Sequence, residues 1–104
     1  MLTLDQKLRP HPDAVDTELE TNELVLLHLE SKSYYSLNVT GMRIWQGLKQ
    51  GSSLRDISRR LQEEFEIDSE RADRCVLRIA SELSRVKLVQ ASVGTNDGIG
   101  KRDK

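Results

Sequence analysis

The spacing of hydrophobic residues changes partway along the chain, and this change limits the possible folds more than any other feature of the sequence. Before Asn38, apolar residues alternate with polar ones or form short aliphatic runs, which is typical of β-strands. After Asn38 they recur three and four residues apart, which is the spacing of one face of an α-helix. A chain of 104 residues has room for one small domain. The sequence therefore predicts an α+β domain in which a sheet precedes a group of helices.

Three strands are expected before the change. Residues 14–20 alternate between an acidic set and a set of Val, Thr and Leu, as a half-buried strand does. We expect the acidic set to face solvent: Asp16, Glu18 and Glu20. Residues 23–30 are dense in Leu and Val, as in a central strand, and residues 34–38 include two tyrosines, which favour strands. Short polar turns between the three predict an antiparallel meander.

Three helices are expected after the change. Asn38 or Thr40 is placed to cap the first helix, and Gly51 to end it. Ser53 is placed to cap the second helix, and Asp68 the third, which extends to about residue 86. Together with the sheet, these helices predict a winged helix-turn-helix-like fold: a three-stranded antiparallel sheet followed by three helices. The positions best explained as core are Leu37, Ile44, Trp45, Leu54, Ile57, Leu61 and Val76.

Composition sets the expected limits of the folded domain. Two prolines punctuate the polar residues 1–12, which we expect to form a flexible N-terminal segment. Residues 91–104 hold three of the six glycines and few large apolar side chains, so we expect a disordered tail. The folded domain is therefore predicted to span residues 13–90.

Several functional classes find no support in the residues. The formal net charge is −1, so the whole chain has no positive field that would attract nucleic acid. No apolar run approaches the roughly 20 residues of a membrane helix, no secretory signal is visible, and Cys75 is the single cysteine. We therefore expect a cytoplasmic protein that does not contact a membrane. The two histidines lack metal-ligand spacing and there is no phosphate-binding glycine loop, so no metal, cofactor or catalytic residue is predicted.

The two outer strands of the expected sheet differ in charge. An exposed sheet edge invites pairing unless charge or proline blocks it. The strand at 14–20 carries three acids, whereas Tyr34, Tyr35, Ser36 and Leu37 carry no charge. An open, aromatic edge of this kind accepts an extended peptide as an additional strand. Coverage by a loop, by the tail or by a second copy of the chain explains the same pattern equally well.

A line of arginines marks the third helix. At about 100° per residue, Arg71, Arg74, Arg78 and Arg85 fall in one narrow stripe beside Cys75, with Glu82 at its border. Guanidinium groups bind carboxylates through paired hydrogen bonds, so this stripe is suited to an acidic peptide. A solvated helix face paired with neighbouring acids is the simpler explanation, and the residues alone favour it slightly.

A family resemblance joins these two features. The run from Tyr35 to Trp45, the segment 51–57, Leu61, the segment 65–68 and residues 83–89 together closely resemble the PqqD family, with a match over about residues 14–90. Members of this family are peptide-recognition elements of pathways for ribosomally synthesised, post-translationally modified peptides. The resemblance implies a winged helix-turn-helix domain that binds the leader of a precursor peptide. It also implies that this domain presents the leader to a modifying enzyme, which in the founding pathway is a radical S-adenosylmethionine protein making pyrroloquinoline quinone.

The resemblance also implies where the leader lies. It places the leader as an added strand against residues 34–38, beside the third helix. By position, the edge hydrogen bonds come from residues 33–37: Ser33, Tyr34, Tyr35, Ser36 and Leu37. The helical side of the site would be lined by Arg71, Arg74, Cys75, Arg78 and Glu82, which are not motif positions. Since no fused catalytic domain is visible, the enzyme is expected to act as a separate protein.

Two alternatives from other functional classes stay open. In a winged-helix DNA-binding regulator, the third helix would enter the major groove. Its first turn carries Asp68, Glu70 and Asp73, which oppose phosphate, and Lys32 is the sole basic residue of the expected hairpin. In a homodimeric interaction module, two copies would pair through the open strand, and this arrangement is compatible with peptide binding.

Overall fold

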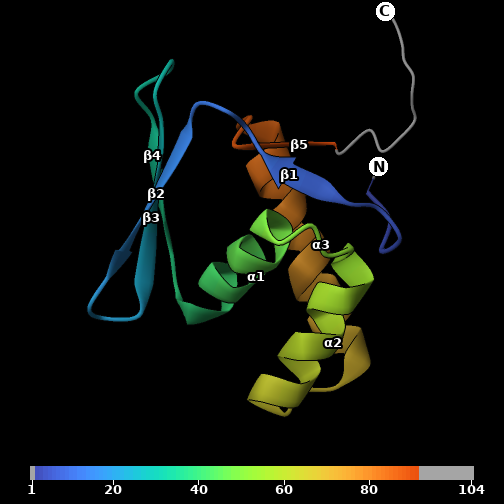
Figure 1. The fold of residues 1–104 in the computed structure, drawn as a ribbon. Coiled ribbons are helices and arrows are strands. Elements are labelled where there is room, and N and C mark those ends of the chain that lie inside the picture. The colour runs from blue at the N-terminus through green and yellow to red at the C-terminus, as the bar shows by residue number, and fades with distance from the viewer. Residues whose placement is uncertain (1, 92–104) are drawn as a thin grey trace, which may run out of the picture.

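The computed structural model describes residues 2–91, which form two sheets and three helices (Figure 1). The larger sheet contains β2 (Ala14–Leu19), β3 (Glu23–His28) and β4 (Tyr34–Leu37) in that order, all antiparallel. It is followed by α1 (Val39–Lys49), α2 (Leu54–Phe65) and α3 (Ser69–Arg85). A second sheet pairs β1 (Leu8–Pro10) with β5 (Val89–Ala91). The predicted α+β fold, with a three-stranded sheet followed by three helices, is confirmed.

The predicted helix caps are present. The Asn38 side chain accepts a hydrogen bond from the Gly41 amide, so Asn38 rather than Thr40 caps α1. Ser53 accepts from the Asp56 amide at the start of α2, and Asp68 from the Arg71 amide at the start of α3. Each cap satisfies one of the amides that have no partner within the first turn of a helix. Short polar side chains in the sequence thus fix where all three helices begin.

The predicted orientation of β2 is wrong, although Glu18 and Glu20 are exposed as expected. Asp16 and Glu18 point toward α1, while Val15 and Leu19 are 42% and 43% exposed on the opposite face. The reason is that α1 offers hydrogen-bond donors to the acids. The indole Nε1 of buried Trp45 donates to Asp16 Oδ2 at 2.8 Å, and the Lys49 ammonium lies 2.7 Å from the same oxygen. Alternation alone gives the two faces of a strand but not which of them is inside.

The pKa of Asp16 reflects this arrangement. The hydrogen bond from Lys49, assisted by that from Trp45, lowers the pKa of the Asp16 carboxyl below its usual value, although partial burial opposes the shift. A folded pKa below the unfolded one means that the ionised carboxylate stabilises the fold above a pH of about 4. This stabilisation is lost as the pH falls through the folded pKa.

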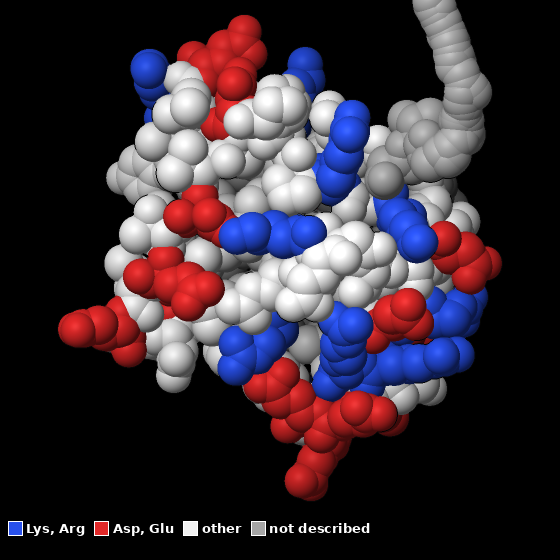
Figure 2. All heavy atoms as spheres, in the orientation of Figure 1, with Lys and Arg blue, Asp and Glu red and all other residues white. Residues whose placement is uncertain are grey.

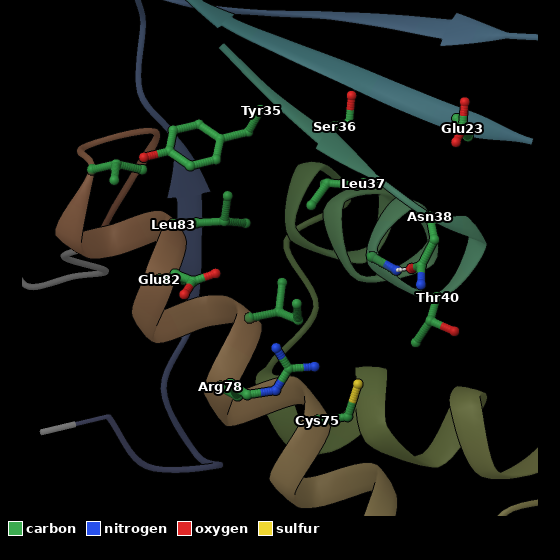
Figure 3. A pocket seen from close by; sticks show the side chains of 13 residues that line it. Glu23, Tyr35, Ser36, Leu37, Asn38, Thr40, Cys75, Arg78, Glu82 and Leu83 are labelled. Carbon is green, nitrogen blue, oxygen red and sulfur yellow. Dashed lines mark hydrogen bonds between the residues drawn. The ribbon is translucent and has the colours of Figure 1, made fainter. Parts of the chain in front are cut away.

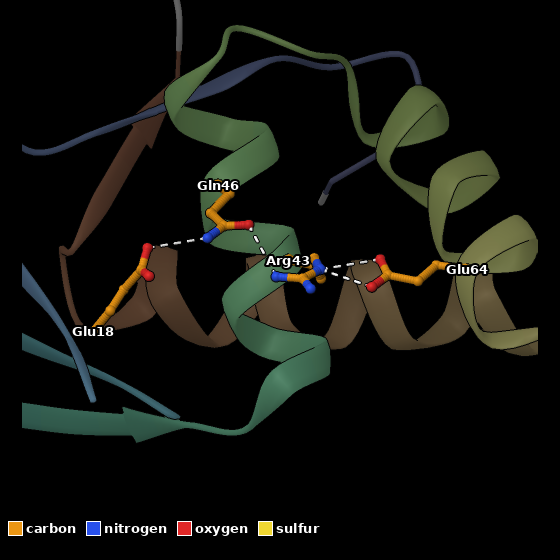
Figure 4. A network of polar contacts seen from close by, with 4 residues as sticks. All are labelled: Glu18, Arg43, Gln46 and Glu64. Atoms are coloured by element: carbon orange, nitrogen blue, oxygen red, sulfur yellow. Dashed lines mark hydrogen bonds and ion pairs between the residues drawn. The ribbon is translucent and has the colours of Figure 1, made fainter. Parts of the chain in front are cut away.

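A polar network extends from the sheet across α1 to α2 (Figure 4). Gln46 donates to Glu18 of β2 and accepts from Arg43, and Arg43 Nε donates to both carboxylate oxygens of Glu64 at 2.9–3.0 Å. Arg43 and Gln46 are half-buried and Glu18 and Glu64 are exposed, so the network is partly screened by solvent and its contribution to stability is small. The contact between α2 and α3 includes a polar pair, in which the buried Ser58 hydroxyl donates to half-buried Asp73.

The N-terminal strand was not predicted from the sequence. The composition predicts a flexible segment at residues 1–12 and a domain that starts at residue 13, yet β1 pairs with β5 and Leu8 is 2% exposed in the core. The folded domain therefore begins before residue 13. A three-residue strand is too short to show periodicity, and Pro10 resembles a loop residue when the sequence is read alone. Of the tail predicted at 91–104, Ala91 closes β5 and residues 92–104 lie outside the described part of the chain.

The hydrophobic core lies between the inner face of the larger sheet and the three helices. All seven core positions predicted from the sequence are buried. Within residues 2–91, none of the helices is both long and apolar enough to cross a bilayer. Acidic and basic side chains are interspersed over the face of the molecule seen in Figure 2.

Candidate functional site

The outer edge of β4 is exposed at one side of the larger sheet. As predicted, β4 is an edge strand, since it pairs with β3 and with no other strand in residues 2–91. The His28 amide donates to the Ser33 carbonyl at 2.8 Å, which makes His28 and Ser33 a hydrogen-bonded pair of the β3–β4 ladder. Hydrogen-bonded and non-bonded pairs alternate in antiparallel ladders. Tyr35 and Leu37 therefore bond to β3, while the amides and carbonyls of Tyr34 and Ser36 point outward.

A cleft of about 480 Å³ separates this edge from α3. Successive side chains of a strand point to opposite faces, so Tyr35 and Leu37 face the cleft side of the sheet while Tyr34 faces away from it. Figure 3 shows Tyr35 on the β4 side of the cleft with Leu83 on the α3 side, and Arg78 and Cys75 projecting from α3. The cleft combines an apolar floor with polar groups along its rim and an unpaired backbone at one side. This combination suits an extended peptide.

Six of the ten predicted site residues line the cleft: Tyr35, Ser36, Leu37, Cys75, Arg78 and Glu82. Four do not. The Ser33 carbonyl is used by β3, and Tyr34 is 71% exposed toward the outer face of the sheet. Arg71 and Arg74 lie nearer the start of α3, beyond the lining of the cleft. The structure thus brings together residues 35–37 with the middle of α3, and leaves the start of the arginine stripe outside.

Several cleft residues were not identified from the sequence. Ile79 and Leu83 lie on the apolar face of α3 and Val86 is its C-cap residue, and none of the three was among the predicted site residues. Their helical spacing is the same whether a side chain is buried or lines a groove, so periodicity does not distinguish these roles. The N-terminal turn of α1 and the start of β3 complete the lining with Asn38, Thr40, Gly41 and Glu23.

Charges around the cleft are mixed. Arg78 and Glu82 lie one turn apart on α3, and both line the cleft. Elsewhere on the stripe, Arg74 lies 3.9 Å from Glu70 and Arg85 lies 3.7 Å from Glu82, and all four side chains are exposed. Exposed pairs of this kind contribute little to stability. Part of the arginine stripe is therefore an ordinary solvated helix face, and Arg78 is its member at the cleft.

Gly41 brings α1 close to β4. A Cβ atom at this position would lie 3.0 Å from the Cβ of Leu37, which is tighter than ordinary van der Waals contact. The missing side chain lets the helix begin directly beneath the last residue of the strand. The floor of the cleft is thereby held against the first turn of α1.

A second polar cluster lies at the turn between β3 and β4. The rings of His11 and His28 lie 5.0 Å apart, although the sequence separates them widely. Potential ligand atoms of Asp13, His28 and Glu30 fall within 4.8 Å of one another. However, His28 Nδ1 accepts hydrogen bonds from the Glu30 and Ser31 amides, so this nitrogen is already engaged within the turn. A metal-bound histidine instead donates from its second nitrogen, so this geometry indicates a structural polar cluster.

Comparison with known proteins gives a consistent result. Residues 23–89 match the family described as coenzyme PQQ synthesis protein D (PqqD). Among solved structures, the chain is similar to TbiB1 in complex with the TbiA(beta) leader peptide, with 26% identity, a TM-score of 0.73, and coverage of 86% of this chain and 99% of that one. It is also similar to lasso peptide synthetase B1 complexed with the leader peptide, with 26% identity, a TM-score of 0.74, and coverage of 81% and 98%. No curated protein matches the sequence.

Proposed function

The chain belongs to the PqqD family, and from this premise we propose that it binds the leader of a ribosomally synthesised precursor peptide and presents it to a modifying enzyme. In this function the chain is a peptide chaperone that catalyses no reaction itself. Both similar solved structures are complexes with leader peptides, and each is covered almost completely by this chain. The similarity therefore concerns the whole of those peptide-binding chains.

The observation that carries the proposal is the unpaired edge of β4 beside the cleft. A leader added as a strand pairs with the outward amides and carbonyls of Tyr34 and Ser36. Main-chain pairing of this kind supplies affinity with little dependence on sequence. Alternate side chains of the leader then point into the cleft, and these supply selectivity.

Two chemical environments inside the cleft determine which leader side chains fit there. Ile79, Leu83 and Val86 offer an apolar surface between α3 and Tyr35. Arg78 offers a charge-assisted hydrogen bond to a carboxylate. The leader is therefore expected to carry large apolar residues alternating with polar ones, and an acid placed to meet α3.

The partner enzyme is a separate protein in this proposal. A radical S-adenosylmethionine enzyme, as in the founding pathway of the family, is one such enzyme. Other peptide-modifying enzymes that act on leader-bearing precursors fit the same binding domain, because strand addition holds the leader and leaves the rest of the precursor free.

The experiment is a binding titration with two kinds of ligand. A fluorescent leader peptide from the precursor gene nearest the chain's own gene is titrated with the protein and followed by anisotropy. Micromolar binding that a scrambled leader of the same composition does not show supports the proposal. Binding to a labelled DNA duplex with a steep salt dependence, and none to the leader, would instead favour the DNA-binding alternative.

A further inference from the structure

The outer face of the larger sheet is apolar and exposed. The register places Val15, Leu27 and Tyr34 side by side on this face, in a row across all three strands, with Thr17, Val25 and Ser36 in the next row. Val15, Leu19 and Tyr34 are 42%, 43% and 71% exposed. In Figure 1, α1 lies against the other side of the sheet, and none of the described elements covers this side.

We propose that this outer face docks the modifying enzyme, through an enzyme surface that is apolar at its centre and basic at its border. The proposal rests on the proposed function, since it concerns how the leader-bound chain meets its enzyme. It adds a second site to the peptide cleft, on the opposite side of the same strand.

The charge around the face favours a basic border on the partner. Three exposed glutamates lie at the two ends of the strands: Glu20, Glu23 and Glu30. The same region has one exposed lysine, Lys32. A second copy of the chain presents the same acidic border, so like charges would meet in a face-to-face dimer. An anionic membrane is repelled for the same reason. A partner with lysines or arginines around an apolar centre is attracted.

The size of the face also favours an enzyme over a second copy. Two strands of six residues and one of four, about 4.8 Å apart and rising about 3.4 Å per residue, give a face of roughly 260 Å². A stable interface buries about 800 Å² on each partner, so the face alone is too small for a stable dimer. A larger enzyme reaches past the face to other surfaces, including the bound leader.

The leader itself extends this face. When a peptide pairs with β4, half of its side chains point into the cleft and the other half point outward, beside Tyr34 and Ser36. The enzyme then contacts the protein and the outward side chains of the leader at once. It follows that the enzyme binds the leader-loaded chain more tightly than the empty one.

The test separates leader binding from enzyme binding. The double variant Val15→Thr and Leu19→Thr replaces exposed apolar side chains by a polar residue that favours strands, and Glu63→Thr on exposed α2 is the matched control. Leader affinity is measured first, by anisotropy, for all three proteins. The modifying enzyme whose gene lies beside the gene for this chain is purified and then titrated with each leader-loaded protein.

The expected result is unchanged leader affinity in both variants, with enzyme affinity lowered about tenfold in the double variant and unchanged in the control. Equal enzyme affinity of the loaded double variant and the loaded natural chain would overturn the docking site. The proposal would also be overturned if the natural chain sediments as a dimer and the double variant as a monomer. A second copy of the chain would then be what covers the face. The leader titration comes before enzyme is added. If the natural chain does not bind leader in that titration, the proposed function itself is refuted.

Discussion

Replacing Ser36 by proline tests strand addition at a single main-chain group. The Ser36 amide points away from β3, so proline there removes a donor from the open edge without taking a hydrogen bond from the sheet. Proline is accepted in edge strands where its nitrogen faces solvent. The lost peptide hydrogen bond contributes about 1 kcal/mol, and the leader carbonyl left without a partner costs about as much again. We therefore expect leader binding to weaken by about 2 kcal/mol, which is roughly 30-fold.

The assay is leader anisotropy, with circular dichroism and thermal unfolding to establish that the variant is folded. Glu18→Pro is the matched control, because the Glu18 amide points outward from β2 at the other edge of the same sheet. This control is expected to bind leader as the natural chain does. A folded Ser36→Pro variant that binds leader with unchanged affinity would refute strand addition at β4.

Three further predictions follow from single contacts. Arg78→Glu is expected to weaken binding of an acidic leader about tenfold, while Arg74→Glu, outside the cleft, changes the affinity less than about twofold. Equal losses of leader affinity in the two variants, measured by anisotropy, would refute a specific role for Arg78. Asp16→Asn is expected to lower the free energy of unfolding at pH 7 by about 1–2 kcal/mol in urea titrations. Because the folded pKa of Asp16 is lowered, the difference in the free energy of unfolding between the natural chain and the variant should shrink as the pH falls below about 4. A constant difference down to about pH 2 would contradict the assigned ion pair. Gly47→Ala places a Cβ 2.6 Å from Ile57 Cγ1. We therefore expect the free energy of unfolding to fall by about 1–3 kcal/mol, despite the better helix propensity of alanine. An unchanged melting temperature would contradict this close packing.

The sequence was most informative where one residue type decides a local structure. Asn38, Ser53 and Asp68 cap the three helices because a short polar side chain satisfies the first amides of a helix without help from distant residues. The change in hydrophobic spacing at Asn38 separated sheet from helices correctly. The uncharged edge of β4 was also predicted, since charge on a strand is visible in the sequence itself.

Features that depend on distant contacts were not predictable in the same way. The pairing of β1 with β5 joins residues about eighty positions apart, and neither strand is long enough to show a pattern. The inward orientation of Asp16 depends on Trp45 and Lys49, which become its neighbours once α1 packs on the sheet. Leu83 was not among the predicted site residues. It packs in the core and also lines the cleft, and helical spacing is the same for both roles.

Hydrogen exchange at β4 tests the central claim most directly. Without peptide, the amides of Tyr34 and Ser36 face the open edge, while those of Tyr35 and Leu37 bond to β3. On saturation with leader, we predict strongly slowed exchange at Tyr34 and Ser36, measured amide by amide by NMR, and little change at Tyr35 and Leu37. Leader binding that leaves exchange at Tyr34 and Ser36 unchanged, or that slows exchange along β2 instead, would contradict the account.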